Sequence, residues 1–258
     1  FATLMRTVAI PFWLAGLGIV IRGAAFAYRK YSPNLRWAEA TGIAFAVSSL
    51  ITPFFFGTIA GAIASGRVAD GRPGGTEHFS SWLNPTSILG GVLAMVTCTF
   101  LAGVFLTSEA DRLGEVDLAE ELRRKTLIGA AATGVVVLAG IPVLARDADT
   151  LFDRLTGRGL PVILVSAVAG SATIVLLWLR RPGRARLTAA AAVAAVVAGW
   201  GVAQFPWLLV DTVRIDDAAG APATMTALLV AAAIAAVLVV PPLLYLLRLA
   251  DTNRVGDA

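Results

Sequence analysis

A chain of 258 residues that is 57% hydrophobic and only 15% charged has too little polar surface to enclose one soluble core, because soluble domains carry about 25% charged residues. The mean hydropathy of +0.79 agrees with apolar stretches that face lipid directly. The net charge of +4 comes without a basic stripe interleaved with aromatic residues, so we predict a membrane protein with no nucleic-acid partner.

Seven apolar stretches are long enough to cross a bilayer as helices, given a rise of about 1.5 Å per residue and a hydrocarbon thickness of roughly 30 Å. In chain order they cover residues 4–28, 40–64, 85–107, 125–145, 160–179, 187–208 and 224–248. The connections are short and polar and leave no room for a second, soluble domain. We therefore predict an all-α membrane protein, a polytopic bundle of about seven transmembrane helices that forms a single domain over residues 1–258.

The first span contains a basic residue, Arg22, well inside its apolar stretch. A charge at mid-membrane costs roughly 2.5–3.5 kcal/mol on insertion scales, and less where the side chain reaches the headgroups. Helical periodicity places Arg22, Phe26 and Arg29 on one face. Two interpretations stay open: Arg22 pairs with a buried carboxylate or a neighbouring subunit, or its guanidinium extends to the headgroups.

Prolines and small residues mark positions where helices bend, end or pack closely. Gly57 with Gly61 and the alanine run at 189–195 predict close helix approach. Charges around Leu118 and Leu122 predict a short amphipathic surface helix at 117–125 that leads into the fourth span. Kinks or helix ends are expected at Pro53, Pro142, Pro206, Pro241 and Pro242.

The side chains that most often bind metals or carry out catalysis are sparse. The single histidine, His78, falls in a loop and cannot supply both axial ligands of a b-type haem, although ligation together with a methionine is chemically allowed. The single cysteine, Cys98, lies in an apolar run, which excludes a thiolate cage. Asp147, Asp149 and Asp153 fall in a predicted outer loop without the spacing of an EF-hand. We expect no catalytic, cofactor-binding or metal site in this chain alone.

Basic residues predict the orientation, because basic loops tend to stay on the cytoplasmic side. With seven spans, one side holds 13 of the 21 Lys and Arg residues and the other side holds 7, with Arg22 inside a helix. The smaller set is Arg6, Arg67, Arg72, Arg146, Arg154, Arg158 and Arg214. We predict a multi-pass membrane protein with its C-terminus in the cytoplasm.

The first span ends in IRGAAFAYRK at 21–30, which resembles the R-x-x-x-F-x-[FY]-R pattern in the third helix of subunit II of cytochrome bd-type quinol oxidases. FSSWLNPTSILGGVLAM at 79–95 is similar to that family's F-x-x-L-N-P entry to a later helix. Further segments resemble the family in the same order along the chain: ITPFFFGTIAGAIASG at 51–66, GVFLTSEADR at 103–112, GWGVAQFPWLL at 199–209 and VPPLLYLL at 240–247.

The resemblance implies nine helices, so we expect the first two to precede Phe1 and to carry the acidic motifs of the family's proton access. It also identifies Arg22, Phe26, Arg29, Asn84 and Pro85 as the matched positions, with structural or route-lining roles. One departure is Ala27, where many members carry Glu or Asp.

By resemblance, this chain is the non-haem subunit of a quinol:oxygen oxidoreductase. The partner, subunit I, carries the b and d haems and oxidises quinol, while this chain supports assembly and oxygen or proton access and sometimes holds a bound quinone; lipid is its other partner. Two alternatives remain: a secondary transporter, for which Pro53 and Pro142 would interrupt helices in two repeats, and a membrane scaffold without a redox role.

Overall fold

The structure is a computed structural model that describes residues 2–29, 31, 34–68, 79–210 and 213–253. It divides into two compact units, residues 1–214 and 215–258, and each is described by itself. The prediction of a single domain over 1–258 therefore stays a prediction. His78 lies outside the described residues.

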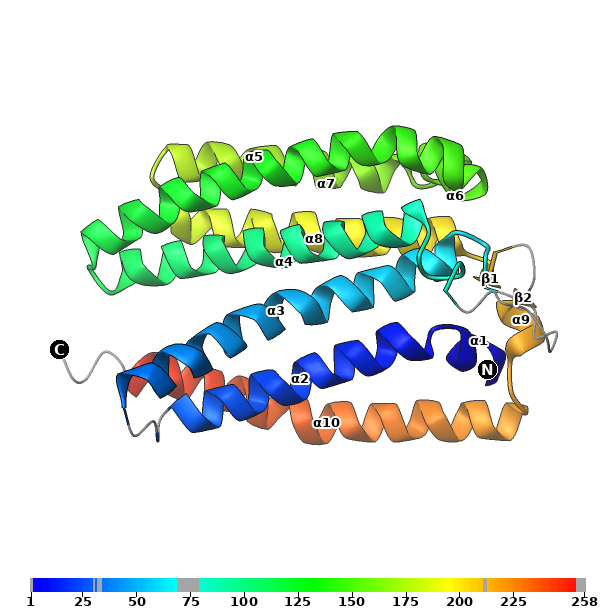
Figure 1. Cartoon of the computed structure of the whole chain (residues 1–258), viewed down its shortest axis with the longest axis horizontal. Coiled ribbons are helices and arrows are strands. Elements are labelled where there is room, and N and C mark those ends of the chain that lie inside the picture. Colours follow the sequence, from blue (N-terminus) through cyan, green and yellow to red (C-terminus); the bar gives the residue numbers. More distant parts are fainter. Residues whose placement is uncertain (1, 30, 32–33, 69–78, 211–212, 254–258) are drawn as a thin grey trace. The chain divides into compact units, whose positions relative to one another are not determined.

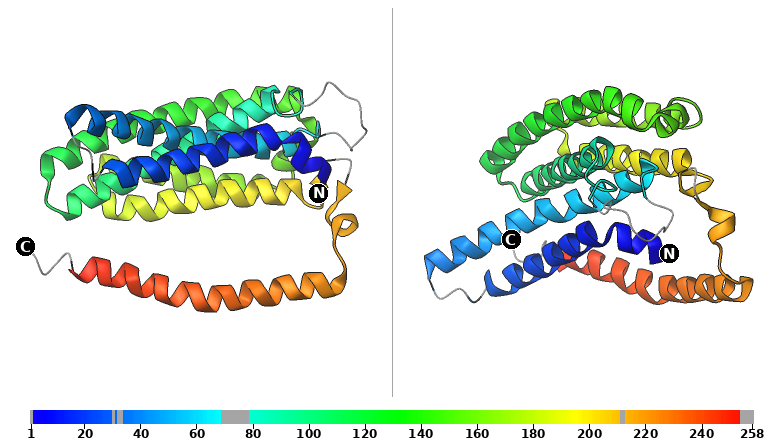
Figure 2. Two further views of the ribbon diagram at one scale, coloured as in Figure 1. Left: turned by 60° about the horizontal axis from the view of Figure 1, so that its bottom comes forward. Right: turned by 45° about the vertical axis from the view of Figure 1, so that its right-hand side comes forward.

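Helices make up almost all of the first unit, and its long helices run up and down along a common direction (Figures 1 and 2). They are α1 (Ala2–Thr7), α2 (Ala9–Arg29), α3 (Leu35–Ala64), α4 (Pro85–Arg112), α5 (Val116–Asp147), α6 (Asp149–Thr156), α7 (Leu160–Trp178) and α8 (Pro182–Gln204). Two short antiparallel strands follow, β1 (Trp207–Leu209) and β2 (Val213–Arg214).

The second unit holds α9 (Ile215–Ala218) and α10 (Pro222–Asn253). Every side chain described between Pro222 and Leu246 is exposed, although this stretch is strongly apolar. An apolar helix with no buried face needs lipid or another protein around it.

Seven of these helices, within the described part of the chain, are long and apolar enough to cross a membrane. They are α2, α3, α4, α5, α7, α8 and the Pro222–Leu246 part of α10, in the order that the sequence predicts. The predicted fold class, an all-α polytopic bundle, is confirmed. The amphipathic segment 117–125 is helical, but it forms the first turns of α5 and not a separate surface helix. Four of the five marked prolines lie inside helices, and Pro206 follows the end of α8.

Glycines let α3 and α4 touch backbone to backbone. A Cβ atom on Gly57 would collide with the carbonyl oxygen of Gly90, and one on Gly90 would lie 2.6 Å from the carbonyl oxygen of Gly57. One turn further along α3, a Cβ on Gly61 would lie 2.6 Å from the Cα of Ser87. The predicted close approach at Gly57 and Gly61 is confirmed, and its partners are Gly90 and Ser87 on α4.

Small residues and hydroxyl groups join the other helices of the first unit. The buried face of α8 is largely alanine, including Ala185, Ala189 and Ala192. Between α7 and α8, Ser166 Oγ donates to the Ala192 carbonyl at 3.0 Å, and Thr173 Oγ1 donates to Thr188 Oγ1 at 2.8 Å. Apolar packing completes the contact, in a core that unites α4, α5, α7 and α8 through Phe100, Val104, Ala130, Leu177, Ala185 and Ala189.

The contact between α3 and α4 predicts a difference between glycines. Gly57→Ala or Gly90→Ala should destabilise the protein by about 1–3 kcal/mol, because each methyl group overpacks a backbone contact. Gly134→Ala on α5 is the matched control, since a Cβ there meets no atom within 4 Å. Thermal unfolding of the detergent-purified protein measures the effect. Equal melting temperatures for the three variants would contradict the packing.

Candidate functional site

The matched residues on α2 form an exposed face. Arg22, Phe26 and Arg29 are all exposed, and the Cζ of Arg22 lies 5.4 Å from the centroid of the Phe45 ring on α3. The Phe26 ring lies 6.4 Å from the Phe45 ring, centroid to centroid. With the residues that the structure describes, Arg22 forms no ion pair. A cation–π contact at an exposed site contributes about 0.5–1 kcal/mol, which is less than the cost of a charge in the membrane.

The end of this face is hollowed. Phe26, Ala27, Arg29 and Tyr31 line an open hollow of about 420 Å³. Ala27, which departs from the expected motif, therefore lies on the wall of the hollow. The hollow is lined by two aromatic rings and one guanidinium, which suits a large apolar group from another molecule better than a small ion.

The other two matched residues, Asn84 and Pro85, start α4. Asn84 is the N-cap: its Oδ1 accepts from the backbone N–H of Ser87 at 2.9 Å and from Ser87 Oγ at 3.0 Å. Its Nδ2 donates to the Ser81 carbonyl at 2.9 Å, and the side chain is buried. Pro85 occupies the first helical turn, where its missing N–H is not needed. The N-P pair is thus a helix-capping element at the tight α3–α4 contact.

An ionic junction that the sequence does not reveal lies at the same end. The carboxylate of Asp147, the last residue of α5, accepts from the Thr86 backbone N–H at 3.0 Å and from Thr86 Oγ1 at 2.7 Å. Arg67, which follows α3, donates to the same carboxylate at 2.5 Å. The Asp147 side chain is only 13% exposed, so one carboxylate ties together the ends of α3, α4 and α5. It also neutralises the positive end of the α4 dipole.

The prediction that Asp147, Asp149 and Asp153 lie in an outer loop is wrong. Asp147 is still in α5, because the helix continues past the apolar stretch that ends at residue 145, and the other two lie in α6. Among the described residues, no group of three or more His, Cys, Asp or Glu side chains is arranged to hold a metal ion. The described residues include no histidine, so they offer no imidazole ligand for a haem iron.

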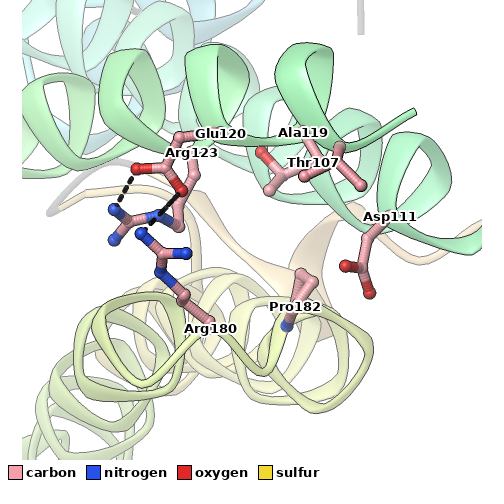
Figure 3. A pocket seen from close by; sticks show the side chains of 8 residues that line it. Thr107, Asp111, Ala119, Glu120, Arg123, Arg180 and Pro182 are labelled. Atoms are coloured by element: carbon pink, nitrogen blue, oxygen red, sulfur yellow. Dashed lines mark hydrogen bonds and ion pairs between the residues drawn. The ribbon is translucent and has the colours of Figure 1, made fainter. Parts of the chain in front are cut away.

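A second cavity, of about 100 Å³, lies between the α4–α5 turn and the α7–α8 turn (Figure 3). Glu120 faces two guanidinium groups there: its carboxylate is 2.5 Å from Arg123 and 3.5 Å from Arg180. Arg123 also donates to the Leu177 carbonyl at 3.4 Å, near the end of α7. With two guanidinium groups beside it, the Glu120 carboxylate links α5 to the α7–α8 turn, which is a structural role.

Known proteins resemble the chain over nearly its whole length. A family model described as cytochrome bd terminal oxidase subunit II matches residues 1–250. The chain belongs to this family. The cytochrome bd ubiquinol oxidase subunit 2 of Bacillus subtilis (strain 168) is 23% identical to it over 214 residues, which are 83% of this chain and 62% of the relative. The chain thus spans less than two thirds of the length of this curated relative.

The solved structure of the bd oxidase from Geobacillus thermodenitrificans shows the same fold. It matches with a TM-score of 0.76 and 23% sequence identity, and the match covers 93% of this chain and 72% of that one. Family membership confirms the resemblance read from the motifs at 21–30 and 79–95. Family and fold together identify a multi-pass membrane protein of the subunit II type.

The junction at Asp147 predicts a specific loss of stability. Asp147→Ala leaves the Arg67 guanidinium and both Thr86 donors without their acceptor, which should cost about 1–3 kcal/mol. The matched control is Asp149→Ala two residues later, whose carboxylate accepts from the adjacent Thr150 N–H and forms no ion pair with a described residue. Thermal unfolding of both purified variants tests this, and an equal fall in melting temperature would argue against a special role for Asp147.

Proposed function

We propose that this chain is the non-haem subunit of a cytochrome bd-type quinol:oxygen oxidoreductase in a bacterial plasma membrane. It supports a haem-bearing subunit I, which oxidises quinol and reduces oxygen to water. The observation that carries the proposal is the family match over residues 1–250, which leaves almost no part of the chain for another function. The relative from Bacillus subtilis is a subunit of a ubiquinol oxidase, which supports quinol as the substrate of the complex.

The exposed face of α2 is the proposed docking site for subunit I. Arg22 precedes the end of α2 by seven residues, about 10 Å along the axis. The contact with Phe45 offsets only part of the cost of placing this charge in lipid. A carboxylate or carbonyl of subunit I would supply the rest, with Phe26 and Arg29 on the same face. The hollow beside Phe26 would then receive an apolar side chain or a bound quinone.

The remaining roles concern assembly, access and orientation. Small-residue contacts make the bundle rigid, and a rigid partner suits assembly of a cofactor-bearing subunit and a route for oxygen or protons. The excess of basic residues at the α2–α3, α4–α5 and α7–α8 turns supports a cytoplasmic location for these turns and for the C-terminus.

Loss of the chain tests the function. A strain lacking it should fail to assemble the oxidase and should lose quinol-dependent oxygen consumption, because the polar group of subunit I that pairs with Arg22 would be left in lipid without its partner. Purification through a tag on this chain should recover a partner that shows the visible absorption of b and d haems. A purified complex without those bands would instead favour a transporter or a scaffold.

Arg22 tests the docking face. Arg22→Ala should weaken association with subunit I by about 2–5 kcal/mol, because it leaves a charged or polar group of the partner buried and unpaired. Arg36→Ala is the matched control, since Arg36 is exposed in the first turn of α3. The ratio of haem to tagged chain after detergent purification measures association. An unchanged ratio in Arg22→Ala would place this residue against lipid instead.

A further inference from the structure

A second surface of the bundle is strongly basic and is not used by the proposed function. The turn between α7 and α8 and the first turns of α8 hold Arg180, Arg181, Arg184 and Arg186, a group that we call the basic turn; all four are exposed. The sequence has no Asp or Glu between Asp153 and Asp211 to offset them. Of these four arginines, only Arg180 forms an ion pair with a described residue, at 3.5 Å from a Glu120 carboxylate that Arg123 already holds.

The backbone conformation at Arg180, in the basic turn, is one that favours glycine over arginine. The N–H of Arg181 donates to the Leu176 carbonyl and that of Arg180 to the Leu177 carbonyl, which is the Schellman pattern that ends a helix. Arg180 occupies its left-handed position, with φ 56°, where glycine is strongly favoured. The chain therefore carries a guanidinium at a position where local stability favours glycine. Departures of this kind from local preference concentrate at functional positions.

Apolar side chains flank the basic turn. Trp178, Leu179 and Leu187 are 77%, 62% and 68% exposed. Trp178 is the last residue of α7 and α8 begins at Pro182, so these groups lie where two spans end. Tryptophan is enriched at this depth because its ring is apolar and its N–H is polar. The combination of exposed apolar groups next to unpaired guanidinium groups matches the boundary between acyl chains and anionic headgroups.

We propose that the basic turn binds the phosphate headgroups of anionic phospholipids. Guanidinium groups donate paired hydrogen bonds to phosphate oxygens, and the net negative charge of the lipid balances the unpaired arginines. Trp178 and Leu187 contact the adjoining acyl chains. The site depends on the chain spanning the membrane and is independent of the oxidase function.

The test uses the complete complex, purified in detergent and placed in vesicles of phosphatidylcholine with or without phosphatidylglycerol. Phosphatidylglycerol should raise the melting temperature of the wild type. Arg181→Gln with Arg184→Gln should lose most of that rise, with an anionic-lipid affinity lower by on the order of tenfold or more. The matched control is Arg6→Gln with Arg146→Gln, two exposed arginines away from the basic turn that form no ion pair with described residues.

Arg180→Gly separates lipid binding from folding. In phosphatidylcholine it should be at least as stable as the wild type, because glycine relieves the left-handed backbone, while its response to phosphatidylglycerol falls. Inorganic phosphate with the wild type should give no shift. An equal loss in both double variants, a full response in Arg181→Gln with Arg184→Gln, or a matching shift with inorganic phosphate would overturn the proposal. If Arg181→Gln with Arg184→Gln lost subunit I but kept its response to phosphatidylglycerol, the proposal would also be overturned, and the basic turn would be assigned to a protein partner.

Discussion

Hydrocarbon offers no hydrogen bonds, and this constraint shapes the chain more than any other. The helices satisfy their own backbone, and hydroxyl groups inside them return to it: Thr52 Oγ1 donates to the Ser48 carbonyl and Thr126 Oγ1 to the Leu122 carbonyl, each at 2.8 Å. Because lipid is as apolar as leucine, burial of leucine gives these helices little reason to associate. Close backbone contact does so instead, which explains the glycines between α3 and α4 and the alanines on the buried face of α8.

The same constraint separates the polar residues by depth. The ion pairs that join different elements lie at helix ends: Arg67 with Asp147 at one end of the first unit, and Glu120 with Arg180 at the other. Each joins elements that are distant in sequence, so together they fix the relative heights of the helices, which sliding apolar surfaces alone would leave free. Arg22 is the exception within a span, and its exposure on α2 is the feature of the first unit that most requires a second protein.

The sequence predicts the fold well because membrane helices are encoded locally. A run of about 20 apolar residues is sufficient to identify a span, and the glycine pair on α3 indicates a packing face before any partner is known. The sequence does not identify that partner: Gly90 lies 33 positions after Gly57, and no local rule pairs them. Asp147 and Arg67 are 80 positions apart and meet only because α3, α4 and α5 end together. Asp147 was assigned to a loop because hydropathy measures where apolar residues stop, whereas a helix stops where its hydrogen bonds do.

The matched motif residues divide into two kinds once their contacts are compared. The roles of Asn84 and Pro85 follow from contacts within this chain: the Asn84 side chain caps α4 and bonds to the Ser81 carbonyl, and Pro85 occupies the first helical turn. Arg22, Phe26 and Arg29 are different: all three are exposed, and the aromatic contacts of Arg22 and Phe26 among the described residues are with the Phe45 ring alone. Residues whose contacts lie within this chain indicate a role in folding, whereas exposed polar and aromatic residues with few contacts indicate a role in association with another protein. On that distinction, the contacts at the start of α4 stabilise the bundle of this chain, and the exposed face of α2 is the one that we propose for association with subunit I.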